Sequence, residues 1–149
     1  MKFASYRCNQ SDKARFGFKR NKYIVDVIKC ADWLNEKKGY TIFLDIPSSL
    51  KECLKNWSIN FELLKKLDGL VTNEDIIETS KIDKPIAKLV SDLELLAPVP
   101  NPQSFRDFYA FEQHVRSARK LRGLDMHPDW FKIPIFYFSN SVALFGHKE

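Results

Sequence analysis

Three side chains with complementary chemistry lie close together in the second half of the chain. Asp107 offers a carboxylate, Tyr109 a phenol and His114 an imidazole. On one uniform helix, Asp107 and His114 would differ by about 20° in direction, while Tyr109 would point about 200° away from Asp107. Convergence of all three therefore requires an extended segment through Tyr109 and a helix that begins within about two residues of Ala110.

Each of these residues also has an ordinary structural explanation. Asp107 suits the N-terminal end of a helix, where a negative charge is favourable. Tyr109 fits a half-buried aromatic position, and His114 fits a polar position on a partly buried helix face. Residue types alone favour these explanations, so the interpretation depends on the sequence around them.

Two surrounding blocks of sequence resemble a known enzyme family. The first runs from Ala97-Pro98-Val99-Pro100 through Asp107-Phe108-Tyr109 to His114. The second contains Pro128, Trp130, Pro134 and Tyr137 and continues through Ser139-Asn140 toward Gly146. In this order, the stretch from Leu93 to Gly146 resembles the beginning of the catalytic domain of the fumarylacetoacetate hydrolase family.

The resemblance implies a role for each matching residue. Asp107 is implied as one of the carboxylates that hold a divalent cation, Mg²⁺ or Ca²⁺ with Mn²⁺ as a further option. His114 is implied as the base that activates water. Tyr109 and Tyr137 are implied as hydroxyl donors to substrate oxygens. Arg122 is implied to bind a substrate carboxylate, although Arg122-Gly123 comes one residue earlier than the family pattern and Arg119 competes for that role.

The implied reaction is hydrolysis of a carbon–carbon bond in fumarylacetoacetate or a related acylpyruvate. A hard cation takes oxygen ligands and polarises an enolisable dicarbonyl, so that hydroxide can attack the ketone and an enolate can leave. A histidine suits the base role because its unperturbed pKa, about 6.5, lies near working pH. Hydratase, decarboxylase, isomerase and lyase reactions on 2-oxo acids are the alternatives within the family.

The family pattern also predicts that this sequence carries only part of the site. The family completes its metal site with a Glu-x-Glu pair and a further Asp, and adds a substrate Lys, all beyond the position where this sequence ends at Glu149. One carboxylate holds Mg²⁺ or Ca²⁺ poorly. We therefore expect either a fragment of a longer, homodimeric hydrolase or a truncated gene product, inactive alone in both cases. With the apolar run from Ile135 to Phe145 uncovered, the isolated chain should aggregate, self-associate or remain partly unfolded.

The remaining sequence predicts an α+β fold. We expect a small sheet-and-helix domain over residues 1–85 and the incomplete start of a mostly-β catalytic domain over residues 86–149. Alternating apolar and polar residues over 2–6, 15–19 and 22–27 predict a small antiparallel sheet. Helical spacing predicts one helix ended by Gly39 and then a broken helix, or two short ones, after the N-cap signal Pro47-Ser48-Ser49.

Further elements are predicted around the chemistry-bearing residues. Pro98, Pro100 and Pro102 predict an extended approach. A helix ended by Gly123 is predicted from an apolar stripe of Phe111, Val115, Ala118 and Leu121. Residues 133–138 are predicted to form a strand with Tyr137 directed toward the same cleft as His114.

Composition limits the class of protein. The 149 residues, 44% hydrophobic and 13% aromatic, are enough for a packed core. No apolar run approaches the roughly 20 residues of a membrane span, and the N-terminus lacks the apolar stretch of a secretory signal. We expect a cytoplasmic protein with no membrane partner. Cys8, Cys30 and Cys53 form no Cys-x-x-Cys pair and are expected to be reduced and mostly buried.

The net charge of +5 suits an anionic substrate, nucleic acid or an ordinary solvated surface. The densest basic cluster consists of Arg116, Arg119, Lys120 and Arg122. No nucleic-acid-binding motif accompanies it, so we expect no nucleic-acid partner. A non-catalytic basic module that binds anionic partners through these residues is the alternative from a different functional class.

Overall fold

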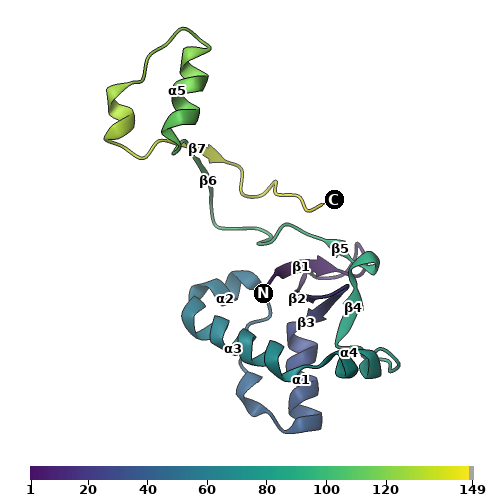
Figure 1. The fold of residues 1–149 in the computed structure, drawn as a ribbon. Coiled ribbons are helices and arrows are strands. Elements are labelled where there is room, and N and C mark those ends of the chain that lie inside the picture. Colours follow the sequence, from purple (N-terminus) through teal and green to yellow (C-terminus); the bar gives the residue numbers. More distant parts are fainter. Residues whose placement is uncertain (148–149) are drawn as a thin grey trace. The chain divides into compact units, whose positions relative to one another are not determined.

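The computed structural model describes residues 1–147 and has an α+β fold, as predicted (Figure 1). The described chain contains five α-helices, a curled five-stranded antiparallel sheet and a two-stranded sheet. It divides into two compact units, one formed by residues 1–100 with 144–147 and the other by Asn101–Ala143. The boundary predicted at residue 85 refers to the domains of the resembled family and not to these compact units, so it stays a prediction.

The five-stranded sheet belongs to the first unit and has the order β4-β3-β2-β1-β5. Its strands are β1 (Phe3–Arg7), β2 (Arg15–Arg20), β3 (Tyr23–Asp26), β4 (Ala87–Leu89) and β5 (Glu94–Leu95), each antiparallel to its neighbours. The first three strands confirm the predicted sheet. The last two are too short to show a period-two pattern, and they lie beyond residue 85 yet complete this sheet.

Helices α1 to α4 follow the capping signals in the sequence. They are α1 (Val27–Lys38), α2 (Leu50–Lys55), α3 (Trp57–Leu70) and α4 (Asn73–Thr79), with short 3-10 turns at Thr41–Phe43 and Val90–Asp92. Gly39 ends α1 with φ 70°, a left-handed conformation that glycine adopts without steric cost. The Ser49 side chain accepts a hydrogen bond from the Glu52 amide at the start of α2. Both predicted caps are confirmed.

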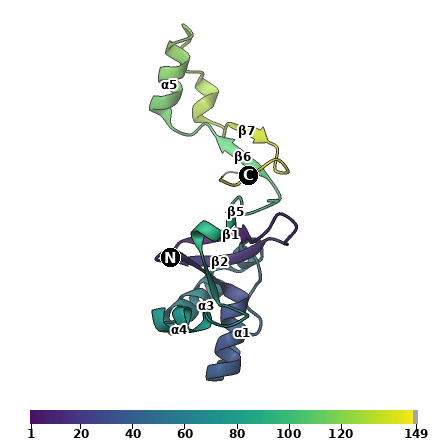
Figure 2. The same cartoon turned by 90° about the vertical axis from the view of Figure 1, so that its right-hand side faces the viewer.

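The core of the first unit lies between one face of the sheet and the helices, which gather on one side of it (Figures 1 and 2). Phe16, Phe18 and Val25 face the helices because the residues of β2 and β3 alternate between the two faces. Leu34 and Leu64 meet them, and all five side chains are at most 2% exposed. Burial of each such side chain contributes about 2 kcal/mol to the free energy of unfolding. All five side chains belong to the first unit, so its core needs no residue of the second unit.

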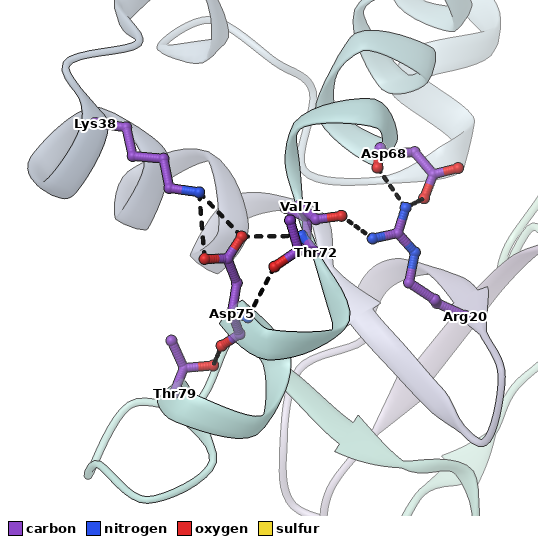
Figure 3. A network of polar contacts seen from close by, with 7 residues as sticks. All are labelled: Arg20, Lys38, Asp68, Val71, Thr72, Asp75 and Thr79. Carbon is purple, nitrogen blue, oxygen red and sulfur yellow. Dashed lines mark hydrogen bonds and ion pairs between the residues drawn. The ribbon is translucent and has the colours of Figure 1, made fainter.

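A polar network ties the ends of the helices to the sheet (Figure 3). Arg20, at the end of β2, donates to the backbone carbonyls of Val71 and Asp68 and forms an ion pair of 2.6 Å with the Asp68 carboxylate. A cation at this position satisfies carbonyls that the end of α3 leaves without helical partners. Lys38, in the last turn of α1, pairs at 3.0 Å with Asp75, which belongs to the capping box of α4.

The opposite face of the sheet carries a second network centred on Asp26. The Tyr6 hydroxyl and the Arg15 Nε both donate to Asp26 Oδ2 at 2.5 Å, and the Lys29 amide donates to Oδ1 at 2.9 Å. Tyr6 lies on β1 and Asp26 on β3, so the tyrosine ring must cross β2. Gly17 makes this possible, since a Cβ there would lie 2.5 Å from the Ile24 side chain and 3.2 Å from the Tyr6 ring.

Hydrogen bonding keeps Asp26 ionised despite its burial. The residue is 3% exposed, and burial alone would raise the pKa of its carboxyl group. Donors from Arg15, Lys29 and Tyr6 outweigh burial and lower the pKa below its usual value. The same burial, next to the Asp26 charge, raises the pKa of the Tyr6 hydroxyl, which stays protonated and donates.

We expect Asp26→Asn to reduce the free energy of unfolding by about 2–3 kcal/mol at pH 7, because Arg15 and Tyr6 lose the charge on which they converge. A carboxyl group with a lowered folded-state pKa stabilises fully above its unfolded pKa, about 3.9. That contribution disappears as the pH falls through the folded-state pKa. Urea unfolding at pH 7 and pH 3 should therefore show a smaller difference between the two proteins at pH 3.

Asp32→Asn is the control, because Asp32 is an exposed acidic residue of α1, the helix that Asp26 caps. Its stability should match the unmodified protein at both pH values. Equal stability of the Asp26→Asn variant and the control at pH 7 would contradict the role assigned to Asp26.

The second unit contains β6 (Phe105–Phe108), α5 (Glu112–Lys120), a 3-10 turn at Pro128–Phe131 and β7 (Phe136–Ser139). The predicted apolar stripe of α5 is buried at Val115 and half-buried at Ala118, but its two ends are exposed. Val115 is 1% exposed, but Phe111 is 81% and Leu121 89% exposed, since both lie outside the helix and meet no facing element within the described unit. Gly123 follows the helix with φ 69°, as predicted.

Two predictions on composition concern the whole described chain. Cys8, Cys30 and Cys53 are free thiols, and the latter two are buried, which confirms the prediction. Burial raises the pKa of Cys30 to about 12 and that of Cys53 to about 11. Among residues 1–147, no helix is long and apolar enough to cross a membrane.

Candidate functional site

The candidate site is built on the antiparallel pairing of β6 with β7. Asp107 lies directly opposite Tyr137 in this ladder, and Phe108 lies opposite Phe136. Because residues alternate between the two faces of a strand, Asp107 and Tyr137 share one face, while Arg106 and Phe136 share the other. The pairing thus brings together two predicted site residues that are 30 positions apart in the sequence.

Tyr109 continues this geometry one step beyond the end of β6. Its amide donates to the carbonyl oxygen of Ile135 at 3.0 Å, which extends the pairing with the other strand. Its carbonyl oxygen accepts a hydrogen bond of 2.9 Å from the indole Nε1 of Trp130. Both backbone groups of Tyr109 are therefore held, and as the residue two after Asp107 it stays on the face of Asp107 and Tyr137.

Three aromatic rings meet on this face. The Tyr109 ring centroid lies 5.8 Å from that of His114 at an interplanar angle of 89°, and 6.4 Å from that of Tyr137 at 66°. Helix α5 begins at Glu112, two residues after Ala110, so its first turn carries His114 back toward Tyr109. The predicted extended segment, helix start and proximity of Tyr109 to His114 are confirmed.

The predicted strand over residues 133–138 is correct in type but begins later. The ladder starts at Phe136, because Pro134 has no amide hydrogen to donate and only the Ile135 carbonyl pairs before that point. Tyr137 lies within the strand and its ring lies near the Tyr109 ring, which in turn lies near the His114 ring. A cleft shared by Tyr137 and His114 stays a prediction.

These residues form an open site. Asp107, His114 and Tyr137 are exposed and Tyr109 is half-buried. An exposed carboxylate, an imidazole and two phenols can together attract a cation, accept a proton and donate hydrogen bonds to an oxyanion. The roles that the resemblance implies for them stay predictions.

Arg122 and Arg119 make other contacts. The Arg122 Nε donates to the Ala118 carbonyl at 3.1 Å, and the Arg119 Nε donates to the Asp125 carbonyl at 2.5 Å. Within the described residues neither guanidinium forms a hydrogen bond or ion pair with Asp107 or His114. The substrate-binding role predicted for Arg122, with Arg119 as its competitor, thus has no geometric support beyond their exposure.

The other face of the two strands is aromatic. The Arg106 guanidinium lies 5.5 Å from the Phe136 ring centroid and 5.2 Å from that of Phe138, and Phe108 packs 5.2 Å from Phe136. Such cation–π contacts contribute about 0.5–1 kcal/mol each at exposed sites. The two faces of the strand pair therefore differ. Asp107 and Tyr137 lie on one face, and Arg106 lies on the other with the phenylalanine rings.

Sequence reasoning overlooked the role of Trp130. In the sequence, Trp130 stands out only as a part of the second block, whereas its indole group holds the Tyr109 carbonyl and so positions the central ring of the site. A tryptophan beside the chemistry-bearing residues is a usable signal, because its N–H group generally finds an acceptor when the ring is partly buried.

A metal does not fit the described residues by themselves. No group of three or more His, Cys, Asp or Glu side chains that could hold an ion occurs among residues 1–147. Asp107 is a suitable oxygen ligand for a hard cation, but one carboxylate falls short of the six or more oxygens that Mg²⁺ or Ca²⁺ coordinates. The predicted cation requires further ligands that this part of the chain does not place beside Asp107.

Comparison with known protein families and with curated protein sequences finds no match for this chain.

We expect Trp130→Phe to loosen the site by removing the hydrogen bond to the Tyr109 carbonyl, a change of about 1 kcal/mol in local stability. In proton NMR spectra, nuclear Overhauser contacts between the Tyr109 and His114 rings should weaken, and the His114 ring protons should shift toward their values in a Tyr109→Leu variant.

Trp33→Phe is the matched control, since Trp33 lies on α1 in the other unit. It should leave the His114 signals unchanged. Unchanged ring contacts in the Trp130→Phe protein would show that Trp130 does not position Tyr109.

Proposed function

We propose that these residues contribute part of the active site of a divalent-metal-dependent hydrolase that cleaves a carbon–carbon bond in fumarylacetoacetate or a related acylpyruvate. The observation that supports this proposal best is the meeting of Tyr109 with His114 and Tyr137 on the face that also carries Asp107. The sequence resemblance names the same four residues, and uniform helix or separate strands would have kept them apart.

In this proposal, His114 accepts a proton from a water molecule at its free imidazole nitrogen. The hydroxide attacks the ketone carbon of the dicarbonyl, and the bond between that carbon and the central carbon breaks. The electron pair leaves with the central carbon as an enolate, which is then protonated. Water has free access to His114, because its side chain is exposed.

The two phenols have the geometry of substrate-orienting donors. Tyr109 and Tyr137 lie on either strand of the pair with ring centroids 6.4 Å apart, so their hydroxyl groups can bind neighbouring oxygens of one small molecule. An acylpyruvate presents such oxygens in its diketo and carboxylate groups. We assign Asp107 the part of a single cation ligand, and we derive no step through the cation, because the described residues do not hold one alone.

The same residues could serve another reaction on a 2-oxo acid, and the products distinguish these reactions from hydrolysis. Hydrolysis of acetylpyruvate yields pyruvate and acetate, whereas decarboxylation releases carbon dioxide and isomerisation or hydration keeps all carbons in one molecule. The basic-module alternative gains no support from the contacts of α5, where Arg116 pairs with Glu112 at 2.7 Å and Arg119 and Arg122 bind backbone carbonyls.

The first test uses the longest protein encoded in frame with these 149 residues. With Mg²⁺ or Mn²⁺ present, it should convert acetylpyruvate to pyruvate and acetate. His114→Ala should lower kcat about 10²–10⁴-fold with a smaller effect on KM, the usual loss when a general base is removed.

His127→Ala is the matched control, since His127 is an exposed histidine of the same unit that caps the 3-10 turn. It should keep kcat close to that of the unmodified protein. A His114→Ala enzyme that is as active as this control would contradict the role of His114 as the base.

The 149-residue chain alone is expected to show no acetylpyruvate cleavage and weak Mg²⁺ binding, because Asp107 supplies one carboxylate where several are needed. An assay at saturating Mg²⁺ or Mn²⁺ checks this directly. Metal-dependent turnover that disappears in His114→Ala would show that the chain holds a complete site and that the ligand count is wrong.

A further inference from the structure

A half-open cavity of about 360 Å³ lies at one end of the five-stranded sheet, in the first unit. This volume falls within the range of about 300–1,000 Å³ that is usual for small-molecule sites. The cavity is bounded by the loop between β1 and β2, the start of α1 and the approach to β4. Its charged lining residues are Asp12, Lys13, Arg15, Asp26, Lys29 and Lys88.

Strand register explains why several of these residues meet. Lys88 pairs with Ile24, and Ile24 lies two residues before Asp26 on the same strand. Lys88 and Asp26 therefore lie on the same face of the sheet. Arg15 pairs with Tyr6 on β1, and Gly17, two residues after Arg15 on β2, pairs with Asp26. Arg15 and Asp26 therefore lie on this same face. This face is opposite to the one that packs on the helices. The buried Asp26 network therefore forms a fixed wall of the cavity.

Positive charge predominates around the cavity, with four cations and two carboxylates. Both carboxylates are already engaged. Asp26 accepts hydrogen bonds at each oxygen, and Asp12 accepts from the Asn9 amide at 3.1 Å and from its side chain at 3.3 Å. Arg15 uses its Nε for Asp26, one of the five N–H donors of a guanidinium.

The three lysines are the uncompensated charges. None of Lys13, Lys29 and Lys88 forms an ion pair with a carboxylate among the described residues. Lys29 and Lys88 are also partly buried, and partial burial of an unpaired ammonium group is unfavourable. Elsewhere in this unit, even the exposed Lys38 has a carboxylate partner at 3.0 Å. An anion in the cavity would supply that missing partner.

We propose that this cavity binds a small organic anion with two or more negative charges, of the phosphate or polycarboxylate class. Lys13, Lys29 and Lys88 surround the anion from three segments, and the remaining N–H groups of Arg15 face it beside Asp26. Several cations converging from different segments favour a multiply charged ligand over a single carboxylate such as acetate. The site is independent of the proposed hydrolase function, because its residues belong to the other unit.

Isothermal titration of the 149-residue chain tests this with pyrophosphate, citrate and acetate as probes. Pyrophosphate or citrate should bind saturably with one site per chain, and acetate should bind far more weakly. Preference between the first two identifies the ligand class. Lys88→Gln should weaken binding of the preferred anion about tenfold, the factor for one charge-assisted hydrogen bond, and Lys29→Gln with Lys88→Gln should weaken it further.

Lys66→Gln is the matched control, since it removes an exposed lysine from α3 and lies outside the cavity lining. It should bind the anion like the unmodified protein, and so should His114→Ala. The proposal is overturned if neither pyrophosphate nor citrate binds saturably, or if the Lys66→Gln protein loses as much affinity as the Lys88→Gln protein. Circular dichroism spectra of all variants verify that they remain folded.

Discussion

The pairing of β6 with β7 is the constraint on which the second unit depends. It joins two strands separated by a helix and a 3-10 turn, and it determines that Asp107 and Tyr137 share a face. Two-stranded sheets are marginally stable by themselves, and this one has little core beneath it, since Val115 is the one buried residue among positions 101–143. Specific contacts at Tyr109 and Arg106 therefore carry more weight here than apolar burial.

The small core of the second unit affects how firmly its candidate catalytic groups are held. A catalytic group works best when its rotamer and backbone are held by surrounding contacts. Tyr109 meets this requirement through its amide and carbonyl hydrogen bonds, whereas within residues 1–147 His114 is held by its place in the first turn of α5 and by the Tyr109 ring alone. The central tyrosine is thus the preorganised element, and the imidazole is the element that a bound substrate must still fix.

The sequence predicted the local structure better than the burial. Capping residues and alternation depend on neighbouring residues only, which is why the sheet of residues 3–26, the Gly39 and Ser49 caps and the start of α5 were predicted correctly. The ends of the stripe on α5 are exposed because burial depends on a facing element, and sequence periodicity cannot supply one. Trp130 and the Asp26 network were missed for a related reason, since each joins segments that are adjacent only after folding.

The excess of positive charge has a different meaning at the two places where it gathers. On α5, Arg116 pairs with Glu112, whereas Arg119 and Arg122 donate to backbone carbonyls and keep their positive charge on the surface of the helix. Around the cavity, lysines from three distant segments have no carboxylate partner among the described residues, although no short stretch of sequence reveals them. The electrostatic field that attracts an anion depends on positive charge that no carboxylate neutralises and on a nearby low-dielectric wall. The number of basic residues alone does not determine it. A net charge of +5 thus does not locate an anion site by itself, and the lysines that support our proposal are spread over three segments of the sequence.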